Sequence, residues 1–206
     1  MFYNILDKKR LEILPLLEKF KKDFYLAGGT GLALQLGHRD SIDFDFFSDK
    51  DFNTEKLYAI IKELFKRHKI IKVQEEKNTL TVFIDENIKL SFFTYKYKLL
   101  KKLVNEPYFN IASILDIAVM KLSAVVSRAT SKDYIDLFFI LKEITLAEIL
   151  VAKNKKFPEL DTNLVLKSLV YFKDIKKEPI KFKNNRNIDL QMVKNFFVQE
   201  VQKISK

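Results

Sequence analysis

The alternation of apolar and polar positions divides the chain into two parts of different character. In the first part, short stretches rich in β-branched and aromatic residues alternate with polar positions, which is the period-two pattern of strands. Five such stretches are expected, at residues 23–29, 41–48, 69–76, 79–85 and 88–97. The last three are separated only by short polar turns, so they predict an antiparallel meander.

Helical periodicity accompanies these strands and then takes over. Residues 7–22 repeat leucine at Leu11, Leu14 and Leu17, the spacing of one helix face. A two-turn helix is predicted over residues 30–37, with Thr30 as its N-cap and Gly37 ending it, and a longer one over 54–67 with Thr54 as its cap. From Asn110 onward only helical segments follow, and the last ends near residue 203.

These patterns predict an α+β protein: a small mixed sheet with flanking helices, followed by a C-terminal helical bundle. We place the boundary near residue 105. Residues 1–105 then form an α/β part and residues 106–206 a helical part, with a cleft between the two.

The composition narrows the class of protein. The 206 residues are 48% hydrophobic and 31% charged, which is typical of a globular chain. Cysteine is absent, so disulfides and thiolate metal sites are excluded. No signal pattern and no membrane-length apolar run is present. We therefore expect a cytoplasmic protein without membrane contact.

Charge is concentrated at the end of the chain. The formal net charge is +10, and residues 167–206 hold ten Lys/Arg against four Asp/Glu, a net charge of +6. Three interpretations remain open: a solvated lysine surface, a docking face for RNA, or a docking face for an acidic partner protein.

All four glycines lie within residues 28–37, shortly before two aspartates. Gly28 and Gly29 fall between a strand and a helix start, where bare backbone and helix N–H groups favour an anion such as a triphosphate. Asp43 and Asp45 are two apart in a predicted strand and so face the same side. Such carboxylates can share Mg²⁺, which prefers oxygen ligands and substrate phosphates, and can serve phosphoryl or nucleotidyl transfer.

Each half of this pattern also has a structural interpretation, since a Gly-Gly pair is usually a turn and an Asp-x-Asp strand often faces solvent. Here Ile42, Phe44 and Phe46 are predicted to form the buried side of the strand, while Ser41, Asp43 and Asp45 line the other with Arg39 just before them. The combination is more specific than either half.

The motifs G-G-T and G-H-R-x-S-x-D-x-D-F-F resemble the AbiEii/AbiGii-type toxin family of the polymerase-β-like nucleotidyltransferase superfamily. The segment LDIAVMKLSAVVSRATSKDYIDL is similar to the helical Lys…Arg…Lys-Asp-x-x-Asp block of that family. The resemblance covers roughly residues 24–142, and the last sixty residues carry none.

The resemblance implies a role for each matching residue. Gly28, Gly29 and Thr30 would hold the nucleotide phosphates, with Arg39 and Ser41 also on the nucleotide. Asp43 and Asp45 would bind Mg²⁺. Catalysis would involve these two aspartates together with Lys121 and Asp133.

Lys121 and Asp133 have competing structural interpretations. Lys121 lies in an apolar helix, where a lysine that only extends its amine to the surface is the alternative to a phosphate clamp. Asp133 and Asp136 share one side of the next helix, where capping and ion pairing are the alternative to a place in the active site.

One departure from the superfamily is visible. Many of its members carry a third metal-binding carboxylate on a later strand, and Ser91 occupies the expected place here. No general base is obvious, although Asp133 is a candidate.

The sequence therefore predicts a magnesium-dependent nucleotidyltransferase that moves a nucleoside monophosphate from an NTP to an acceptor. RNA, in particular tRNA, is the expected acceptor, with a protein hydroxyl as the rival. The resemblance implies the toxin of a toxin–antitoxin or phage-defence pair, hence a cognate antitoxin partner. The alternative is a catalytically degenerate nucleotidyltransferase fold that only binds nucleotide or RNA.

Overall fold

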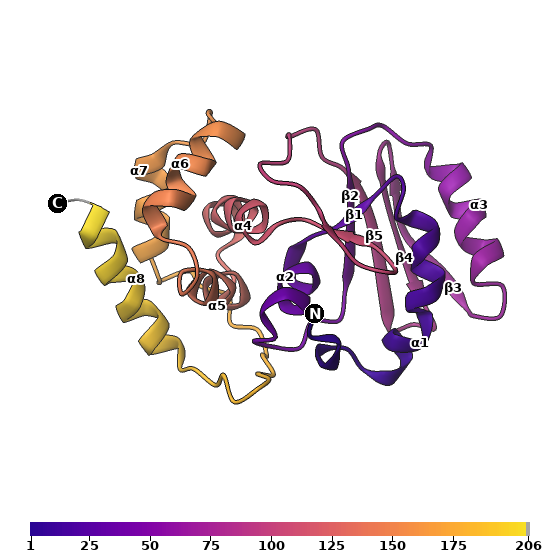
Figure 1. Ribbon diagram of the computed structural model, residues 1–206, viewed down its shortest axis with the longest axis horizontal. Coiled ribbons are helices and arrows are strands. Elements are labelled where there is room, and N and C mark those ends of the chain that lie inside the picture. The colour runs from indigo at the N-terminus through magenta and orange to yellow at the C-terminus, as the bar shows by residue number, and fades with distance from the viewer. Residues whose placement is uncertain (205–206) are drawn as a thin grey trace.

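A computed structural model describes residues 1–204. Its elements alternate between helix and strand in the first half of the chain and are helical in the second (Figure 1). The first half contains a 3-10 turn at Tyr3–Ile5, α1 (Lys8–Leu17) with a 3-10 turn at Glu18–Phe20, β1 (Tyr25–Leu26), α2 (Gly28–Leu36), β2 (Phe44–Ser48), α3 (Thr54–Leu64), β3 (Ile70–Glu76), β4 (Thr79–Ile84), β5 (Ile88–Thr94), β6 (Val104–Asn105) and β7 (Asn110–Ile111). The second contains α4 (Ile114–Arg128), α5 (Ser131–Ile140), α6 (Leu146–Lys156), α7 (Thr162–Val170) and α8 (Leu190–Ile204).

The strands form one mixed sheet in the order β3-β4-β5-β2-β1-β7-β6. The predicted meander is present as β3, β4 and β5, which pair antiparallel. The central strand β2 runs parallel to β5 and antiparallel to β1. The predicted α+β fold class is therefore confirmed. The short strand β7 pairs with β1, so the chain leaves the sheet only after residue 111.

Two hydrophobic cores lie on opposite sides of the sheet. One lies beneath α1 and α3 and contains the ring ladder Phe44, Phe46 and Phe92. The other joins the helices of the second half to the opposite face of the sheet. Helix α2 contributes to both, with Leu32 and Leu36 in one core and Ala33 and Leu34 in the other. It therefore lies between the sheet and the helical part, as Figure 1 shows.

Several local predictions differ from the structure. Helix α2 begins at Gly28, two residues before Thr30, and Ala27 is its N-cap, so Thr30 is not the cap. The cap of α3 is Asn53, whose side chain accepts from the Lys56 N–H, rather than Thr54. The helix predicted over 7–22 ends at Leu17 and tightens into a 3-10 turn.

Gly37 ends α2 as predicted, in the left-handed conformation at φ 65°. A Cβ at this position would lie 2.5 Å from the Phe2 ring, so both the backbone and the packing require glycine.

The connection between α7 and α8, residues 171–189, crosses back to the first half of the chain, and we call it the strap (Figure 1). Near its start it bonds to the α4–α5 turn, where the Ser131 N–H donates to the Lys176 carbonyl at 2.9 Å. Further on it bonds to the loop after α2, where the Asp40 N–H donates to the Lys181 carbonyl at 2.8 Å. The strap thus contacts both the helical part and the first half of the chain.

None of the helices within residues 1–204 combines the length and the apolar character needed to cross a bilayer.

Candidate active site between the sheet and the helical part

A cavity of about 440 Å³ opens where α2, β2, α4, α5 and the strap meet. Seven of the predicted site residues line it: Gly29, Arg39, Ser41, Asp43, Asp45, Lys121 and Asp133. Residues that the sequence analysis did not select line it as well: Asp40, Ile42, Lys89, Arg128, Thr130, Lys132, Glu178, Pro179 and Lys181. We call this cavity the cleft.

In the first turn of α2, side chains from the following loop and β2 lie close to the backbone of two glycines. Gly28 has φ 63°, and a Cβ there would lie 2.9 Å from an Asp45 carboxylate oxygen. At Gly29 a Cβ would lie 2.7 Å from Arg39 Nη2 and 3.2 Å from Ser41 Oγ. Within the described chain no side chain caps this helix, an arrangement in which the first N–H groups can bind an anion.

Asp43 and Asp45 stand differently from the prediction. Strand β2 begins only at Phe44, so Asp43 belongs to the preceding loop. Two side chains hold that loop: Arg10 Nε donates to the Ile42 carbonyl at 2.7 Å, and Thr30 Oγ1 donates to the Asp43 carbonyl. Ile42, predicted to be buried, is 52% exposed because the strand has not yet started.

The hydroxyl of Thr30 serves the protein's own structure. Its side chain is buried and lies 2.8 Å from Ser41 Oγ, and it donates to the Asp43 carbonyl. Thr30 therefore positions Ser41 and Asp43 through its hydroxyl.

Burial raises the pKa of Asp45, and the neighbouring Asp43 adds to this, while Lys89 opposes it. An ionised pair here is electrostatically unfavourable without a cation. Within residues 1–204 no group of three or more His, Asp or Glu side chains gathers as a metal site. Two carboxylates nevertheless suit Mg²⁺, which is commonly held by one or two carboxylates together with substrate phosphates and water.

Ser91 lies in register with Asp45, across the parallel β2–β5 pair, which is the place expected for a third carboxylate. It is fully buried, and its hydroxyl has no hydrogen-bond partner within the described chain. On the same strand, Lys89 reaches the cleft and supplies a positive charge near Asp45. Where many superfamily members carry an acid, this chain has the uncharged Ser91. The nearest charge on the same strand is the cation Lys89.

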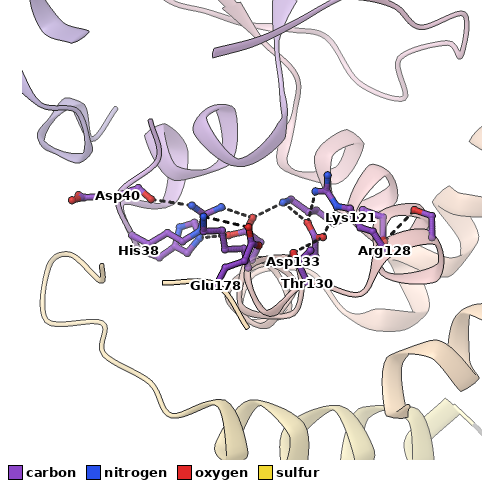
Figure 2. Close-up of polar contacts among 12 residues, drawn as sticks. His38, Asp40, Lys121, Arg128, Thr130, Asp133 and Glu178 are labelled. Carbon is purple, nitrogen blue, oxygen red and sulfur yellow. Dashed lines mark hydrogen bonds and ion pairs between the residues drawn. The ribbon is translucent and has the colours of Figure 1, made fainter. Parts of the chain in front are cut away.

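Asp133 lies among Lys121, Arg128 and Thr130 (Figure 2), and Asp136 on the same helix also has cationic partners. Lys121 Nζ lies 2.8 Å from Asp133 Oδ1 and 2.6 Å from Asp136 Oδ2. Asp133 also accepts from Arg128 Nε at 2.8 Å and from Thr130 Oγ1 at 2.9 Å. Lys121 is thus held by both carboxylates of α5 rather than simply extending its amine to the surface.

Asp136 joins the two halves of the chain. Arg39 donates to it through Nε at 2.7 Å and Nη2 at 2.8 Å, and His38 Nε2 lies 2.7 Å from Oδ1. Burial alone would raise the pKa of Asp136, but Arg39 and Lys121 hold it well below its usual range. The pKa of Asp133 is likewise lowered against the effect of burial, by Arg128 and Lys121. Both groups are therefore ionised ion-pair partners at neutral pH.

His38, which the sequence analysis did not select as a site residue, is part of this network. Its side chain is fully buried, and burial lowers its pKa even though Asp136 favours the charged form. A neutral ring that donates through Nε2 to Asp136 fits these surroundings. Only the distant position of Asp136 in the sequence concealed this contact.

The chain matches the family "Nucleotidyl transferase AbiEii toxin, Type IV TA system" over residues 16–202. The chain belongs to the AbiEii nucleotidyltransferase toxin family. It is a transferase by that membership, and the match extends to residue 202, into the part of the chain where the motifs gave no resemblance.

The chain is also similar to individual proteins. Protein aq_aa25 of Aquifex aeolicus (strain VF5) is 39% identical over 162 residues, covering 76% of this chain and 77% of that protein. Among solved structures, MenT4, a nucleotidyltransferase toxin of Mycobacterium tuberculosis H37Rv, superposes with a TM-score of 0.62 at 15% identity. That similarity covers 94% of this chain and 82% of MenT4. JHP933 from Helicobacter pylori superposes with a TM-score of 0.59 at 19% identity, covering 99% of this chain and 93% of JHP933. At these identities the two structures show that the AbiEii chain shares their fold.

Proposed function

We propose that this AbiEii chain is a magnesium-dependent nucleotidyltransferase that moves a nucleoside monophosphate from an NTP to an RNA acceptor, with tRNA as the leading candidate. The observation that carries the proposal is the convergence in one cleft of an uncapped glycine-rich helix start, two adjacent carboxylates and a set of cations. The type IV toxin–antitoxin membership further supports a cognate antitoxin as its partner. We also propose a role in phage defence.

Asp43 and Asp45 are the residues that would hold Mg²⁺. When bound, the ion supplies charge neutralisation for the triphosphate and the departing pyrophosphate. Gly28 leaves room beside Asp45, because any side chain at residue 28 would meet its carboxylate.

The remaining residues bind and orient the NTP. The N–H groups of Gly28, Gly29 and Thr30 at the start of α2 donate to the phosphate oxygens, helped by the helix dipole. Ser41 stands beside Gly29 and is held there by Thr30. Lys121, fixed between Asp133 and Asp136, directs a positive charge into the cleft.

The charge balance of the cleft favours an anionic substrate. Among residues 1–204 its lining includes six Lys/Arg side chains and five Asp/Glu side chains. The charge of a bound Mg²⁺ makes this lining clearly positive, as a triphosphate requires. The ion-paired Asp133 is a poor proton acceptor because its lowered pKa disfavours protonation, so we assign it a positioning role.

Incubation of the protein with each radiolabelled NTP, Mg²⁺ and total RNA tests the proposal. Label should appear in an RNA band, and it should be lost when Asp43 or Asp45 is replaced. Purified tRNA, purified rRNA and protein fractions are compared as acceptors. Label confined to a protein band would replace RNA by a protein acceptor. NTP binding without any transfer would favour the catalytically degenerate binding module.

A further inference from the structure

A second cavity of about 280 Å³ lies beside the cleft, at the end of α4 and α7. Arg128 lines both cavities, so the two lie on either side of its guanidinium. The lining also includes Val125, Tyr171, Asp174 and Lys176. We call it the side cavity. Tyr171, Asp174 and Lys176 lie outside the motifs from which the phosphate and metal sites were predicted.

Hydrogen bonds to the main chain fix its walls. The Tyr134 hydroxyl donates to the Ser168 carbonyl at 2.6 Å and lies 3.3 Å from the Tyr171 carbonyl, so it fastens the end of α7 to α5. The Lys176 N–H donates to the Ala129 carbonyl at 3.0 Å, which ties the strap to the α4–α5 turn. The side cavity is therefore a preformed feature of the fold.

Its lining combines an aromatic ring, a carboxylate and two cations, which are groups that can contact a nucleotide. Tyr171 is 53% exposed, and within the described chain its ring has no aromatic partner, which leaves a π-face for a base. Asp174 is exposed and can accept from the N–H groups of a base edge. Lys176 and Arg128 add positive charge for a neighbouring phosphate.

Arg128 connects the side cavity to the chemistry. Its Nε and Nη2 face Asp133, which fixes the plane of the guanidinium, while 59% of its side chain remains exposed. A guanidinium held in this way keeps a free edge for a phosphate oxygen at the boundary of the two cavities. A volume below the range of about 300–1,000 Å³ that is usual for ligand pockets fits a single nucleoside better than a strand.

We propose that the side cavity holds one nucleoside of the substrates, with its base on Tyr171 and its phosphate toward Arg128. This inference rests on the proposed function and adds the position and recognition of a nucleoside to it. The nucleoside belongs either to the incoming NTP or to the terminal nucleotide of the acceptor RNA, and both present the same chemistry.

Binding by the full-length protein tests the proposal, with Tyr171→Ala as the informative variant. Each NTP is titrated calorimetrically with Ca²⁺ replacing Mg²⁺, and a 5′-fluorescent tRNA is titrated by anisotropy. Tyr171→Phe keeps the ring and is the matched control. Leu164→Ala removes an exposed apolar side chain from α7 and controls for effects on that helix. Thermal melting of all variants confirms that they fold.

We expect Tyr171→Ala to lower the affinity for one of the two ligands roughly ten- to a hundredfold. The affinities of Tyr171→Phe and Leu164→Ala should equal those of the wild type. A loss of NTP affinity assigns the side cavity to the NTP, and a loss restricted to tRNA assigns it to the acceptor. Wild-type affinity of Tyr171→Ala for both ligands would overturn the inference, and so would an equal loss in Tyr171→Phe.

The two proposals fail in different ways. If the wild-type protein binds NTP and tRNA but transfers nothing, the transferase proposal fails while the binding data still decide on the side cavity. If it transfers nucleotide normally and Tyr171→Ala binds both ligands normally, only the side-cavity assignment fails. A wild-type protein that binds neither ligand overturns both.

Discussion

Two pairs of aspartates at the candidate active site have opposite surroundings, and three of the four side chains line the cleft: Asp43, Asp45 and Asp133. Asp43 and Asp45 are partly exposed, and the pKa of Asp45 is raised by burial and by its neighbour. Asp133 and Asp136 are fully buried, surrounded by Lys121, Arg39 and Arg128, and their pKa values are lowered. The first pair is open to the cleft and is suited to take a cation together with the substrate. The second already has its cations and serves to hold them in place.

This difference explains how one site can be both open and firmly built. The buried pair joins α5 to α4 through Lys121 and to the loop after α2 through Arg39. A buried ion pair is costly to break, because removing one partner leaves an uncompensated charge. Removing one of the open carboxylates relieves repulsion instead, and replacing a functional residue in this way commonly raises stability.

The largest expected effect on activity is that of Asp45→Asn. Transfer should fall by about 10³-fold or more, because a metal ligand is worth several kcal/mol of charge stabilisation. The melting temperature of the metal-free protein should stay or rise, since burial disfavours the Asp45 charge. Transfer assays and thermal melting with and without Mg²⁺ measure both effects. Asp49→Asn, at an exposed residue beyond the other end of β2, is the control and should behave as wild type. Wild-type transfer by Asp45→Asn would refute the metal assignment.

The largest expected effect on stability is that of Asp136→Asn. This change leaves Arg39 and Lys121 without their shared carboxylate and should cost about 3–5 kcal/mol. For a chain of this size the melting temperature should fall by roughly 10 °C. Calorimetry or circular dichroism measures the shift, and Glu63→Gln, which breaks an exposed pair with Lys66, should leave it unchanged. If Asp136→Asn melted at as high a temperature as Asp45→Asn, the proposed difference between the two aspartate pairs would be wrong.

Replacing either of two glycines at positive φ should cost stability, but only one replacement should also weaken NTP binding. Gly28→Ala introduces a Cβ at positive φ and next to Asp45, so it should cost about 1–2 kcal/mol of stability and also lower NTP affinity about tenfold or more. Gly37→Ala meets the Phe2 ring and should lower stability by about 1–2 kcal/mol or more, with NTP affinity retained in the folded protein. Isothermal titration and chemical denaturation separate the two quantities. Equal losses of affinity in both variants would contradict this division.

The strap lysines should divide in a similar way. Lys181 lines the cleft, so Lys181→Ala should weaken NTP binding severalfold, whereas Lys173 and Lys177 lie exposed outside it. Neutralising Lys173 and Lys177 should leave NTP binding intact and flatten the dependence of log RNA affinity on log salt by about 0.7–0.9 for each RNA phosphate that is no longer neutralised. RNA titrations at several salt concentrations measure the slope. An unchanged slope together with escape from antitoxin inhibition in cells would assign this surface to the antitoxin, and no change in either would leave a solvated lysine surface.

The smallest expected effect concerns pH. The lowered pKa of His38 means that the unfolded chain takes up this proton first as the pH falls. Its contribution to stability is therefore complete above the unfolded pKa of about 6.5 and is lost as the pH falls toward the folded value. His38→Gln keeps an N–H donor without a charge, so its loss of stability between pH 7 and 5 should be shallower than in the wild type. Denaturation at several pH values measures this, and parallel curves would exclude His38 as the titrating group.

The local elements of the first half could be predicted closely from the sequence. The meander over residues 69–97 and the helix stop at Gly37 follow from patterns a few residues long, and both are confirmed. The helix caps were predicted less well, although Thr30 and Thr54 are both residue types that commonly cap helices. Helix α2 begins two residues before Thr30, and α3 is capped by Asn53, the residue before Thr54. Start positions depend on tertiary contacts such as the bond from Thr30 to the Asp43 carbonyl.

By itself, the sequence determined the family, the α+β fold class and the motif that brings Gly28, Gly29, Asp43 and Asp45 together, because these residues are linked by short segments of regular structure. Only the tertiary structure decided what surrounds them. The contacts of His38 and Arg39 with Asp136 join residues 98 and 97 positions apart, and the strap returns to the cleft from the far end of the chain. Such contacts form because buried charges require partners and because the helices of the second half pack on α2 through a shared hydrophobic core. Neither requirement leaves a periodic pattern in the sequence.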